Sequence, residues 1–468
     1  MKICKESYIR RRARLKKDVG SGLLLFLGND EVGMNYADNA YRFRQDSTML
    51  YFFGLDFPGI AAIIDIDEDR EIVFGNDLTI DDIVWTGPMP SLKERCEPVG
   101  ITDVRPMSAL AKIVNSKLSN SQIIHFLPPY RGDHRVWLWE LLGVEPAAQT
   151  TKASVEFIKA IVKQRNYKDE EEIRLIEESV DLSTEMHLAA YHTVRPGIHE
   201  SQVAAAVEEV ACRHGNALAF PTIATVQGQV LHNHGFIHDL KEGDIFLLDA
   251  GAETKNHYAG DLSSSMPVGE KFTDRQAEVY NIHLRSFQAA VDKLQLGTPF
   301  RDAHIAAATE IARGMKELGL MRGDPVEAAE CGAYALFFPC GLGHMVGLDV
   351  HNMENLGEQY VGYAEGQVKS TQFGFKSLRL ARPLEKGFVF TVEPGIYFIP
   401  ELMDKWEAEG QFRDFICYDK LGPWRNFTGL RNELNYVMTD SGAQLLGTIK
   451  KPMTIEEVYK AKNGEKIQ

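Results

Sequence analysis

The segment LLDAGAETKNHYAGDLSSSMPVG, from Leu247 to Gly269, joins two apolar runs through a polar turn and carries two aspartates. Asp249 ends the first run, and Asp261 follows after turn-forming residues that include Lys255 and Asn256. A hairpin over this stretch would bring the two carboxylates together. Aspartates at the ends of buried strands are costly unless they meet a cation or hydrogen-bond donors. The segment therefore predicts either a metal site or a pair of turn-capping, salt-bridged acids.

Three later segments carry further candidate ligands. FFPCGLGHMVGLDVHN, from Phe337, places His344 after glycine-rich backbone. TVEPGIYFI, from Thr391, puts Glu393 at the end of an apolar run, and GLRNELNYVMT, from Gly429, starts a strand whose second charged residue is Glu433. Taken singly, the histidine suits a core position and each glutamate suits the surface. Together, four carboxylates and one imidazole could neutralise two divalent cations, which would activate a shared water molecule for hydrolysis.

Length, composition and charge indicate a two-domain globular protein and disfavour some classes of partner. A chain of 468 residues predicts two domains, and 44% apolar and 25% charged residues are ordinary for a globular protein. A formal net charge of −15 disfavours nucleic acid and anionic membranes as partners. The basic stretch from Arg10 to Lys17 is expected to be a solvated helix face.

The chain is expected to stay in the cytoplasm. It has no apolar run of about 18 residues and no recognisable secretory signal. Its six cysteines lack the spacing of a disulfide framework, so we expect free thiols.

Apolar and helical patterns divide the chain near residue 155. Before it, short apolar runs at Gly22, Ile60, Glu71 and Gln122 predict a buried sheet. After it, a long amphipathic helix follows Lys168, and strands at Gly243, Gly387 and Asn432 alternate with helices. Two similar segments, from Val194 and from Gln295, hint at an internal duplication. We predict an α/β domain over 1–155 and an α+β domain, rich in hairpins, over 156–468.

In this order and context, the motifs resemble the pita-bread dinuclear metallopeptidases, in their Xaa-Pro aminopeptidase and prolidase branch. The matching segments are DAGAE, YAGD, GLGHMVGLDVH, TVEPGIY and the Gly-x-Arg-x-Glu of Gly429 to Glu433. RQDSTMLYFFG, from Arg44, is similar to the family's amino-terminal signature. The resemblance implies a pita-bread catalytic domain preceded by a smaller, aminopeptidase P-like α/β domain with a mixed sheet.

The resemblance also implies a ligand set for two divalent ions per subunit, with Mn²⁺ expected and cobalt, zinc or iron as alternatives. The implied ligands are Asp249, Asp261, His344, Glu393 and Glu433, with Asp261 bridging the ions. Arg431 would hold Asp249 in place. His234 and His238 are expected to be structural.

Catalytic and substrate-binding roles follow from the same resemblance. Glu393 would be the general base that takes a proton from a metal-bridging hydroxide. His232 would contact the reacting centre, and His351 would stabilise the tetrahedral intermediate. Tyr397 would orient ligands and contact substrate, and Arg379 would grip the carboxylate of a dipeptide.

Three positions depart from the family pattern. Cys340 stands where relatives generally carry a histidine, and we expect a modified substrate pocket there. The spacing between Asp249 and Asp261 is one residue longer than usual, and Asn432 replaces the usual aliphatic residue beside Glu433. None of these changes removes a ligand.

The expected activity is proteolysis by a metal-dependent exopeptidase that cleaves proline-containing peptides after an N-terminal residue. A prolidase restricted to Xaa-Pro dipeptides is the alternative, favoured by SLRLARPLEKG and by an insertion over 401–427. Two alternatives belong to other classes of protein. One is a metal-free pita-bread binding module, and the other is a creatinase-like hydrolase that uses histidine without metal. Relatives commonly form dimers or tetramers, so the resemblance implies a homodimer or homotetramer. Trp85 is expected in the core rather than at a subunit border.

Overall fold

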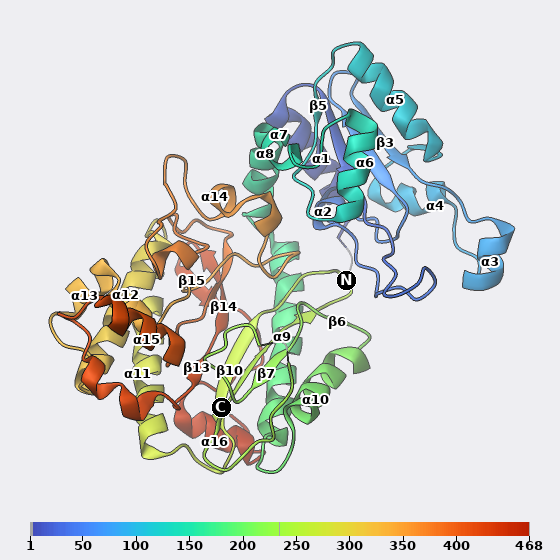
Figure 1. The fold of residues 1–468 in the computed structure, drawn as a ribbon. Helices are drawn as coiled ribbons and strands as arrows, with labels where there is room; N and C mark the ends of the chain where they lie inside the picture. The colour runs from blue at the N-terminus through green and yellow to red at the C-terminus, as the bar shows by residue number, and fades with distance from the viewer. Residues whose placement is uncertain (1–2, 234, 468) are drawn as a thin grey trace. The chain divides into compact units, whose positions relative to one another are not determined.

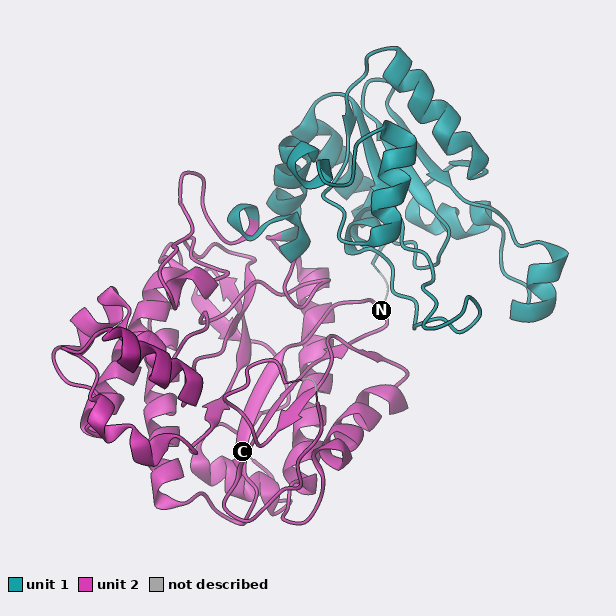
Figure 2. Cartoon of the chain, viewed as in Figure 1, with its two compact units in different colours: residues 1–165, 353–360 teal, residues 166–352, 361–468 magenta. Residues whose placement is uncertain are grey.

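The computed structural model describes residues 3–233 and 235–467, which form two compact units (Figure 2). Residues 1–165 and 353–360 form unit 1, and residues 166–352 and 361–468 form unit 2. Unit 1 ends beyond the boundary expected at residue 155 because helix α8 (Val155–Arg165) packs against helix α1 (Lys5–Val19).

A five-stranded sheet forms the centre of unit 1, with strand order β4-β3-β2-β1-β5. Its strands are β1 (Leu23–Leu27), β2 (Ala61–Asp65), β3 (Arg70–Phe74), β4 (Asp103–Arg105) and β5 (Ile124–His125). The pairs β1–β2 and β2–β3 are antiparallel, whereas β1–β5 and β3–β4 are parallel. The sheet is therefore mixed, as the sequence predicted, although β4 gave no apolar signal because its three residues are only half-buried.

Helices surround this sheet (Figure 1). Besides α1 and α8 they are α2 (Ser47–Phe53), α4 (Leu92–Cys96), α5 (Ser108–Ser119), α6 (Gly132–Leu142) and α7 (Gln149–Lys152). The short helix α3 (Ile80–Thr86) protrudes from unit 1, away from the sheet. The expectation that Trp85 lies in the core is wrong, because this side chain on α3 is 87% exposed. Ile80 and Val84, on the same short helix, are also exposed.

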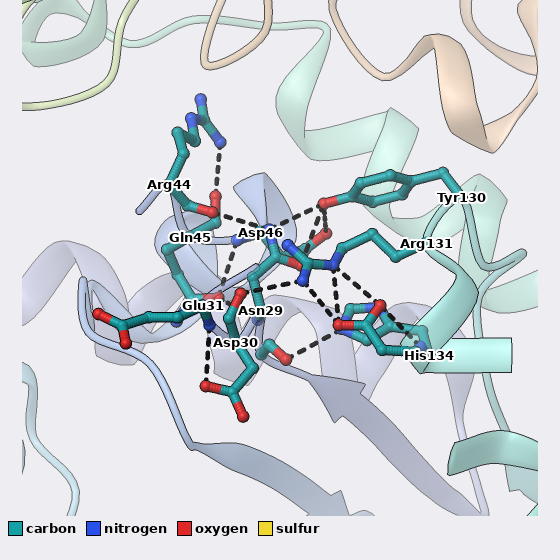
Figure 3. Close-up of polar contacts among 11 residues, drawn as sticks. Asn29, Asp30, Glu31, Arg44, Gln45, Asp46, Tyr130, Arg131 and His134 are labelled. Carbon is teal, nitrogen blue, oxygen red and sulfur yellow. Dashed lines mark hydrogen bonds and ion pairs between the residues drawn. The ribbon is translucent and has the colours of Figure 1, made fainter. Parts of the chain in front are cut away.

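The amino-terminal signature at Arg44 builds a polar network that joins β1 to α2 (Figure 3). Gln45 is fully buried, and its Oε1 accepts hydrogen bonds from the backbone N–H groups of Asn29 and Asp46. Asp46 caps α2 through the N–H groups of Thr48 and Met49. The Tyr130 hydroxyl also lies 3.2 Å from Asp46 Oδ2. These contacts give the signature a structural role in unit 1.

The basic stretch on α1 is only partly the solvated helix face that the sequence predicted, because Arg10, Arg14 and Lys17 are exposed but Arg11 and Arg12 are buried. Arg12 is fully buried, and its guanidinium donates to the Phe52 and Val99 carbonyls at 2.8 and 3.0 Å. Its Nε lies 2.7 Å from Glu71 Oε2. Charge runs do not reveal this burial, because it depends on carbonyls that converge from distant parts of the chain.

Unit 2 contains two three-stranded antiparallel sheets, of order β10-β8-β7 and β11-β14-β15, and two short strand pairs, β12–β13 and β6–β9. The strands are β6 (Ala217–Leu218), β7 (Ile223–Thr225), β8 (Ile245–Ala250), β9 (Ala252–Glu253), β10 (Leu262–Pro267), β11 (Val389–Val392), β12 (Gly395–Tyr397), β13 (Gly429–Arg431), β14 (Leu434–Thr439) and β15 (Gly442–Leu445). The helices are α9 (Glu170–Thr193), α10 (Glu200–Arg213), α11 (Asp274–Val291), α12 (Phe300–Glu317), α13 (Pro325–Cys331), α15 (Pro400–Glu409) and α16 (Ile455–Lys462). The short helix α14 (Glu358–Val361) belongs to unit 1 up to Tyr360.

The two similar sequence segments occupy equivalent places in unit 2. Gly197 and Gly297 both have φ near +85° and donate to the carbonyls of Leu240 and Leu384 at 2.8 Å. Each turn leads into an alanine-rich helix, α10 or α12, which packs against its neighbour α9 or α11. In Figure 1 the green pair α9–α10 and the yellow pair α11–α12 lie against different sheets. The structure thus supports the internal duplication.

Two chain-wide expectations can also be compared with the structure. All six cysteines are free, as predicted. Among residues 3–233 and 235–467, none of the helices combines the length and apolar character needed to cross a bilayer.

Replacing Arg12 with Met should destabilise unit 1. The change leaves the Phe52 and Val99 carbonyls without their donors in the core, at a cost of about 2–4 kcal/mol. Urea unfolding followed by circular dichroism measures the loss. The exposed neighbour Arg10, changed to Met, is the control and should shift the transition by less than about 0.5 kcal/mol. Equal effects of the two substitutions would contradict the assigned role of Arg12.

Candidate metal centre

Strand ends in the two halves of unit 2 position the four carboxylates. Asp249 lies near the end of β8, and Asp261 directly precedes β10, which pairs with β8. Glu393 directly follows β11, and Glu433 directly precedes β14, which pairs with β11. Each half therefore contributes one acid at the end of an outgoing strand and one before the returning strand.

His344 is held against β11 by backbone hydrogen bonds. The Thr391 N–H donates to the His344 carbonyl at 2.9 Å, and the Glu393 N–H donates to the Leu342 carbonyl at 2.8 Å. Gly343 makes this approach feasible, because a Cβ there would lie 2.1 Å from the Thr391 carbonyl oxygen. The glycine-rich motif thus serves to bring an imidazole close to the ends of the strands.

The side chains converge around His344. Its Nε2 lies 3.2 Å from Asp261 Oδ2 and 3.4 Å from Glu393 Oε1. Ligand atoms of Asp261, His344 and Glu433 all lie within 4.8 Å of one another. His344 Nδ1 lies 3.1 Å from its neighbour's carbonyl, Met345 O. Donation by Nδ1–H would leave the Nε2 lone pair directed at the carboxylates.

Arg431 supports the opposite side of the cluster. Its Nη2 lies 2.5 Å from Asp249 Oδ2, and its Nη1 and Nε donate to Tyr397 Oη and Ser263 Oγ, both at 2.8 Å. Ser263 in turn donates to Glu433 Oε2 at 2.8 Å. Arg431 therefore orients carboxylates from both halves of the unit.

Burial and mutual repulsion raise the proton affinity of the acids. Burial, with the charge of Glu393, raises the pKa of Asp261 to about 7. Burial, Asp261 and Glu393 also raise the pKa of Asp249 to about 7, although Arg431 opposes this shift. The pKa of Glu433 lies well above its usual range, because Glu433 is buried and faces these acids. The cluster therefore binds cations readily, whether protons or metal ions.

The remaining expected residues line the same cavity of about 170 Å³, with one exception. His232, His351 and Arg379 face it together with the five candidate ligands. Burial and the charges of Arg431 and Arg379 lower the pKa of His232, which favours the neutral form of its imidazole. Tyr397 is fully buried and meets the site through Arg431 and Cys340 rather than along the cavity wall.

Cys340 also lines the cavity, next to Gly341. Burial raises the pKa of its thiol to about 12, and its Sγ lies 3.9 Å from Tyr397 Oη. A protonated thiol is a weak hydrogen-bond donor, and at this place in the lining it shapes the pocket.

The sequence predicts structural roles for His234 and His238, which follow His232 in the chain. The His238 Nδ1 lies 3.2 Å from Glu200 Oε1, away from the cluster. His234 lies outside the described residues.

Sequence reasoning missed three residues that support the ligands. Ser263 bridges Arg431 and Glu433, and the Thr391 hydroxyl contacts both the His344 N–H and Glu393 Oε1. The Asn435 side chain spans the backbone N–H and carbonyl of Asp261. Ser263 belongs to a run of three fully buried serines in β10, and polar residues in a buried strand were an available signal.

The residues present fit a divalent metal centre. Asp249 Oδ1 and Glu433 Oε1 are buried without a hydrogen-bond partner within the described part of the chain. Such oxygens are costly unless a cation or donor meets them. Carboxylate oxygens with one imidazole nitrogen form a donor set that suits first-row divalent ions.

Comparisons with known proteins agree with this geometry. The family model of the metallopeptidase family M24 matches residues 174–440, and that of the aminopeptidase P N-terminal domain matches residues 8–126. The chain therefore belongs to the metallopeptidase family M24, a membership that implies the use of divalent metal. This confirms the expected family and the enzyme class, a hydrolase.

Its relatives carry two different names. The Xaa-Pro dipeptidase of Rattus norvegicus is 30% identical, over 95% of this chain and 90% of the relative. The probable Xaa-Pro aminopeptidase of Emericella nidulans is 28% identical, over 97% and 96%. Zinc-substituted E. coli aminopeptidase P in complex with product superposes with a TM-score of 0.80 at 23% identity, over the full length of both chains. This likeness confirms the predicted fold class, a smaller α/β domain followed by an α+β catalytic domain.

Replacing Asp261 with Asn should stabilise the metal-free protein in a pH-dependent way. The folded carboxyl stays protonated up to its raised pKa of about 7, whereas the unfolded one ionises above about pH 4. The advantage of the amide should therefore be absent below pH 4 and grow between pH 4 and 7. It can grow by up to about 1.4 kcal/mol per pH unit, and it should stay constant above pH 7.

Denaturant unfolding in chelator at pH 4.5, 6 and 8 measures this difference. The exposed Asp414, changed to Asn, serves as the control and should leave the pH dependence unchanged. A stability difference between Asp261→Asn and the parent chain that is the same at all three pH values would contradict the shifted pKa.

Proposed function

We propose that this chain is a metal-dependent exopeptidase that hydrolyses the bond between an N-terminal residue and proline. The observation that carries the proposal is one cavity lined by five candidate ligands together with His232, His351 and Arg379. The names of the relatives, Xaa-Pro aminopeptidase and Xaa-Pro dipeptidase, support this substrate class.

Asp249, Asp261, His344, Glu393 and Glu433 would hold two divalent ions per subunit, with Mn²⁺ as the expected metal. When bound, such ions lower the pKa of a water molecule and polarise a substrate carbonyl. The paired arrangement of the strand ends supports two ions, because each half of the unit provides two acids. Asp261, near the centre of the cluster, would contact both ions.

The other cavity residues would handle the proton and the substrate. Glu393 would take a proton from the attacking water and pass it to the leaving proline nitrogen. His351 would stabilise negative charge on the carbonyl oxygen, and neutral His232 would position the reacting peptide. The rings of His351 and His344 lie 4.2 Å apart, which places His351 directly beside the ligands.

Prolidase activity remains the second candidate because Arg379 lines the cavity. A guanidinium can bind a carboxylate through two parallel hydrogen bonds, and a dipeptide offers its C-terminal carboxylate close to the scissile bond. The similarity to Xaa-Pro dipeptidases supports this alternative.

We also propose a cytoplasmic homodimer or homotetramer without nucleic-acid or membrane partners. The six free cysteines suit a reducing compartment, and the net charge of −15 suits neither anionic partner. Exposed apolar side chains on α3, Trp85 among them, support a subunit contact, because such a cluster is costly to leave in water.

Manganese-loaded protein should release the N-terminal residue from Xaa-Pro peptides, and chelator should abolish the release. Changing Glu393 to Gln should lower kcat by about 10²–10⁴-fold, the usual contribution of a general base. Liquid chromatography of the released amino acid measures the rate. The control is Glu401→Gln on the exposed start of α15, which should retain full activity. Release from no Xaa-Pro peptide at any Mn²⁺ concentration would overturn the proposal.

The substitution Arg379→Ala separates the two candidate activities. If Arg379 binds a dipeptide carboxylate, kcat/KM for an Xaa-Pro dipeptide should fall about 100-fold, equivalent to roughly 2.7 kcal/mol. For the same peptide extended by two residues, kcat/KM should change little, because the C-terminal carboxylate of that peptide lies elsewhere. Exposed Lys376, changed to Ala, controls for local disturbance. Equal losses on both substrates would rule out a carboxylate clamp.

A further inference from the structure

A buried histidine on α11 contacts the chain on both sides of the metal centre. His283 is fully buried, and its Nε2 lies 2.8 Å from the Pro394 carbonyl oxygen. The same nitrogen lies 3.3 Å from the Asn432 backbone nitrogen. Pro394 directly follows the candidate ligand Glu393, and Asn432 directly precedes Glu433. One edge of the imidazole ring therefore contacts the backbone next to two candidate ligands, which stand at the ends of two different strands, β11 and β14.

The protonation of His283 follows from its surroundings. Burial lowers the pKa of His283 to about 4. The nearby cations Lys451 and Arg431 also lower this pKa, whereas the hydrogen bond with Pro394 raises it. A neutral imidazole has one N–H, and the shorter contact, with a carbonyl, requires that N–H on Nε2. Nδ1 is then a bare acceptor, buried without a hydrogen-bond partner in the part of the chain that the structure describes.

The Pro394 carbonyl needs such a donor because the strand ladder is interrupted there. β11 ends at Val392 and β12 begins at Gly395, so residues 393 and 394 lie between two different sheets. Glu393 projects from this interruption, where its own N–H donates to the Leu342 carbonyl but neither strand ladder extends to the Pro394 carbonyl. A donor from α11 supplies the missing constraint on its position.

Asn432 places the second segment against the same ring. Its side-chain Oδ1 accepts from the Ser265 N–H at 3.2 Å, which fixes the residue to β10. The aromatic rings of Tyr280 and Phe287 flank His283 and hold it in place. Their centroids lie 6.1 and 6.5 Å from the centroid of the imidazole ring. Asn432, a departure from the family pattern, thus lies where the backbone of the Glu433 segment packs against His283. With the proton on Nε2, this contact with the Asn432 N–H is a packing contact and not a hydrogen bond.

We propose that His283 is a positioning residue for the metal centre, which sets the spacing between the segments that carry Glu393 and Glu433. The inference rests on the proposed function, because only a metal centre makes that spacing matter. His283 touches neither substrate nor the cavity. Its effect reaches the ions through the backbone beside the two glutamates.

Variants of His283 distinguish this role from simple core packing. His283→Phe keeps a ring between Tyr280 and Phe287 but removes the donor to Pro394. His283→Gln carries an amide N–H near the place of Nε2, whereas the shorter His283→Asn reaches only the place of Nδ1. Loss of a partner that orients a ligand typically weakens metal binding about 10–100-fold, which is the expected effect of Phe and Asn. Gln should recover most of the affinity.

The experiment measures Mn²⁺ dissociation constants by titration calorimetry on the full, chelator-stripped chain, with the visible absorption of the Co²⁺ form as a second readout. His304→Phe is the matched control, because His304 is equally buried and bonds Tyr334 Oη, at 2.6 Å, rather than a ligand segment. It should lower thermal stability without changing either metal readout. Circular dichroism verifies that every variant folds. If the His283→Phe variant does not fold, the comparison of the His283→Gln and His283→Asn variants tests the proposal instead.

Weakened binding by Phe and Asn, recovery by Gln and unchanged binding by His304→Phe would support the positioning role. Parent-like affinity of His283→Phe, equal affinities of the Gln and Asn variants, or an equal loss in His304→Phe would overturn it. If the parent chain itself binds no divalent ion, the proposed function fails first and this inference fails with it.

Discussion

Repulsion among four carboxylates that share one buried cavity constrains the structure of unit 2. Asp249, Asp261, Glu393 and Glu433 cannot all be ionised in the cavity without counterions, since burial removes the water that would screen them. Arg431 compensates for part of this charge through Asp249. The remainder must come from bound protons or metal ions, so cation binding and folding stability are linked at this site.

The duplicated architecture explains how a chain can hold these acids so close together. Each half forms a rigid antiparallel sheet with a helix pair packed against it, and each places its acids at adjacent strand ends. Rigid strands hold the carboxylates more firmly than flexible loops could, which offsets the repulsion between them. His344 has no counterpart in this scheme. It comes from a separate segment that lies along β11, and it would supply the nitrogen ligand that the two halves lack.

The sequence could predict the parts of the structure that depend on local pattern. Asp249 and Glu393 stand where apolar strand runs end, and the family motifs imply the remaining ligands, all of which line one cavity. The burial of Arg12, the exposure of Trp85 and the place of His283 could not be predicted. Each depends on groups brought together from distant parts of the chain or on the packing around a helix, to which single-sequence periodicity is blind.

Charge balance in the cavity bears on the choice between the two candidate activities. Two divalent ions would neutralise the four carboxylates, and the charge on Arg431 is directed at Asp249 on the far side of the cluster. The positive charge of Arg379 then faces the cavity, where Cys340 offers a neutral thiol. A dipeptide presents its carboxylate within reach of such a charge, whereas a longer peptide presents only neutral backbone there. A guanidinium in a partly desolvated cavity interacts more strongly with a carboxylate than with an amide carbonyl. As a carboxylate-binding residue, Arg379 would favour short substrates, and the exclusion of longer ones would require a steric barrier at the mouth of the cavity.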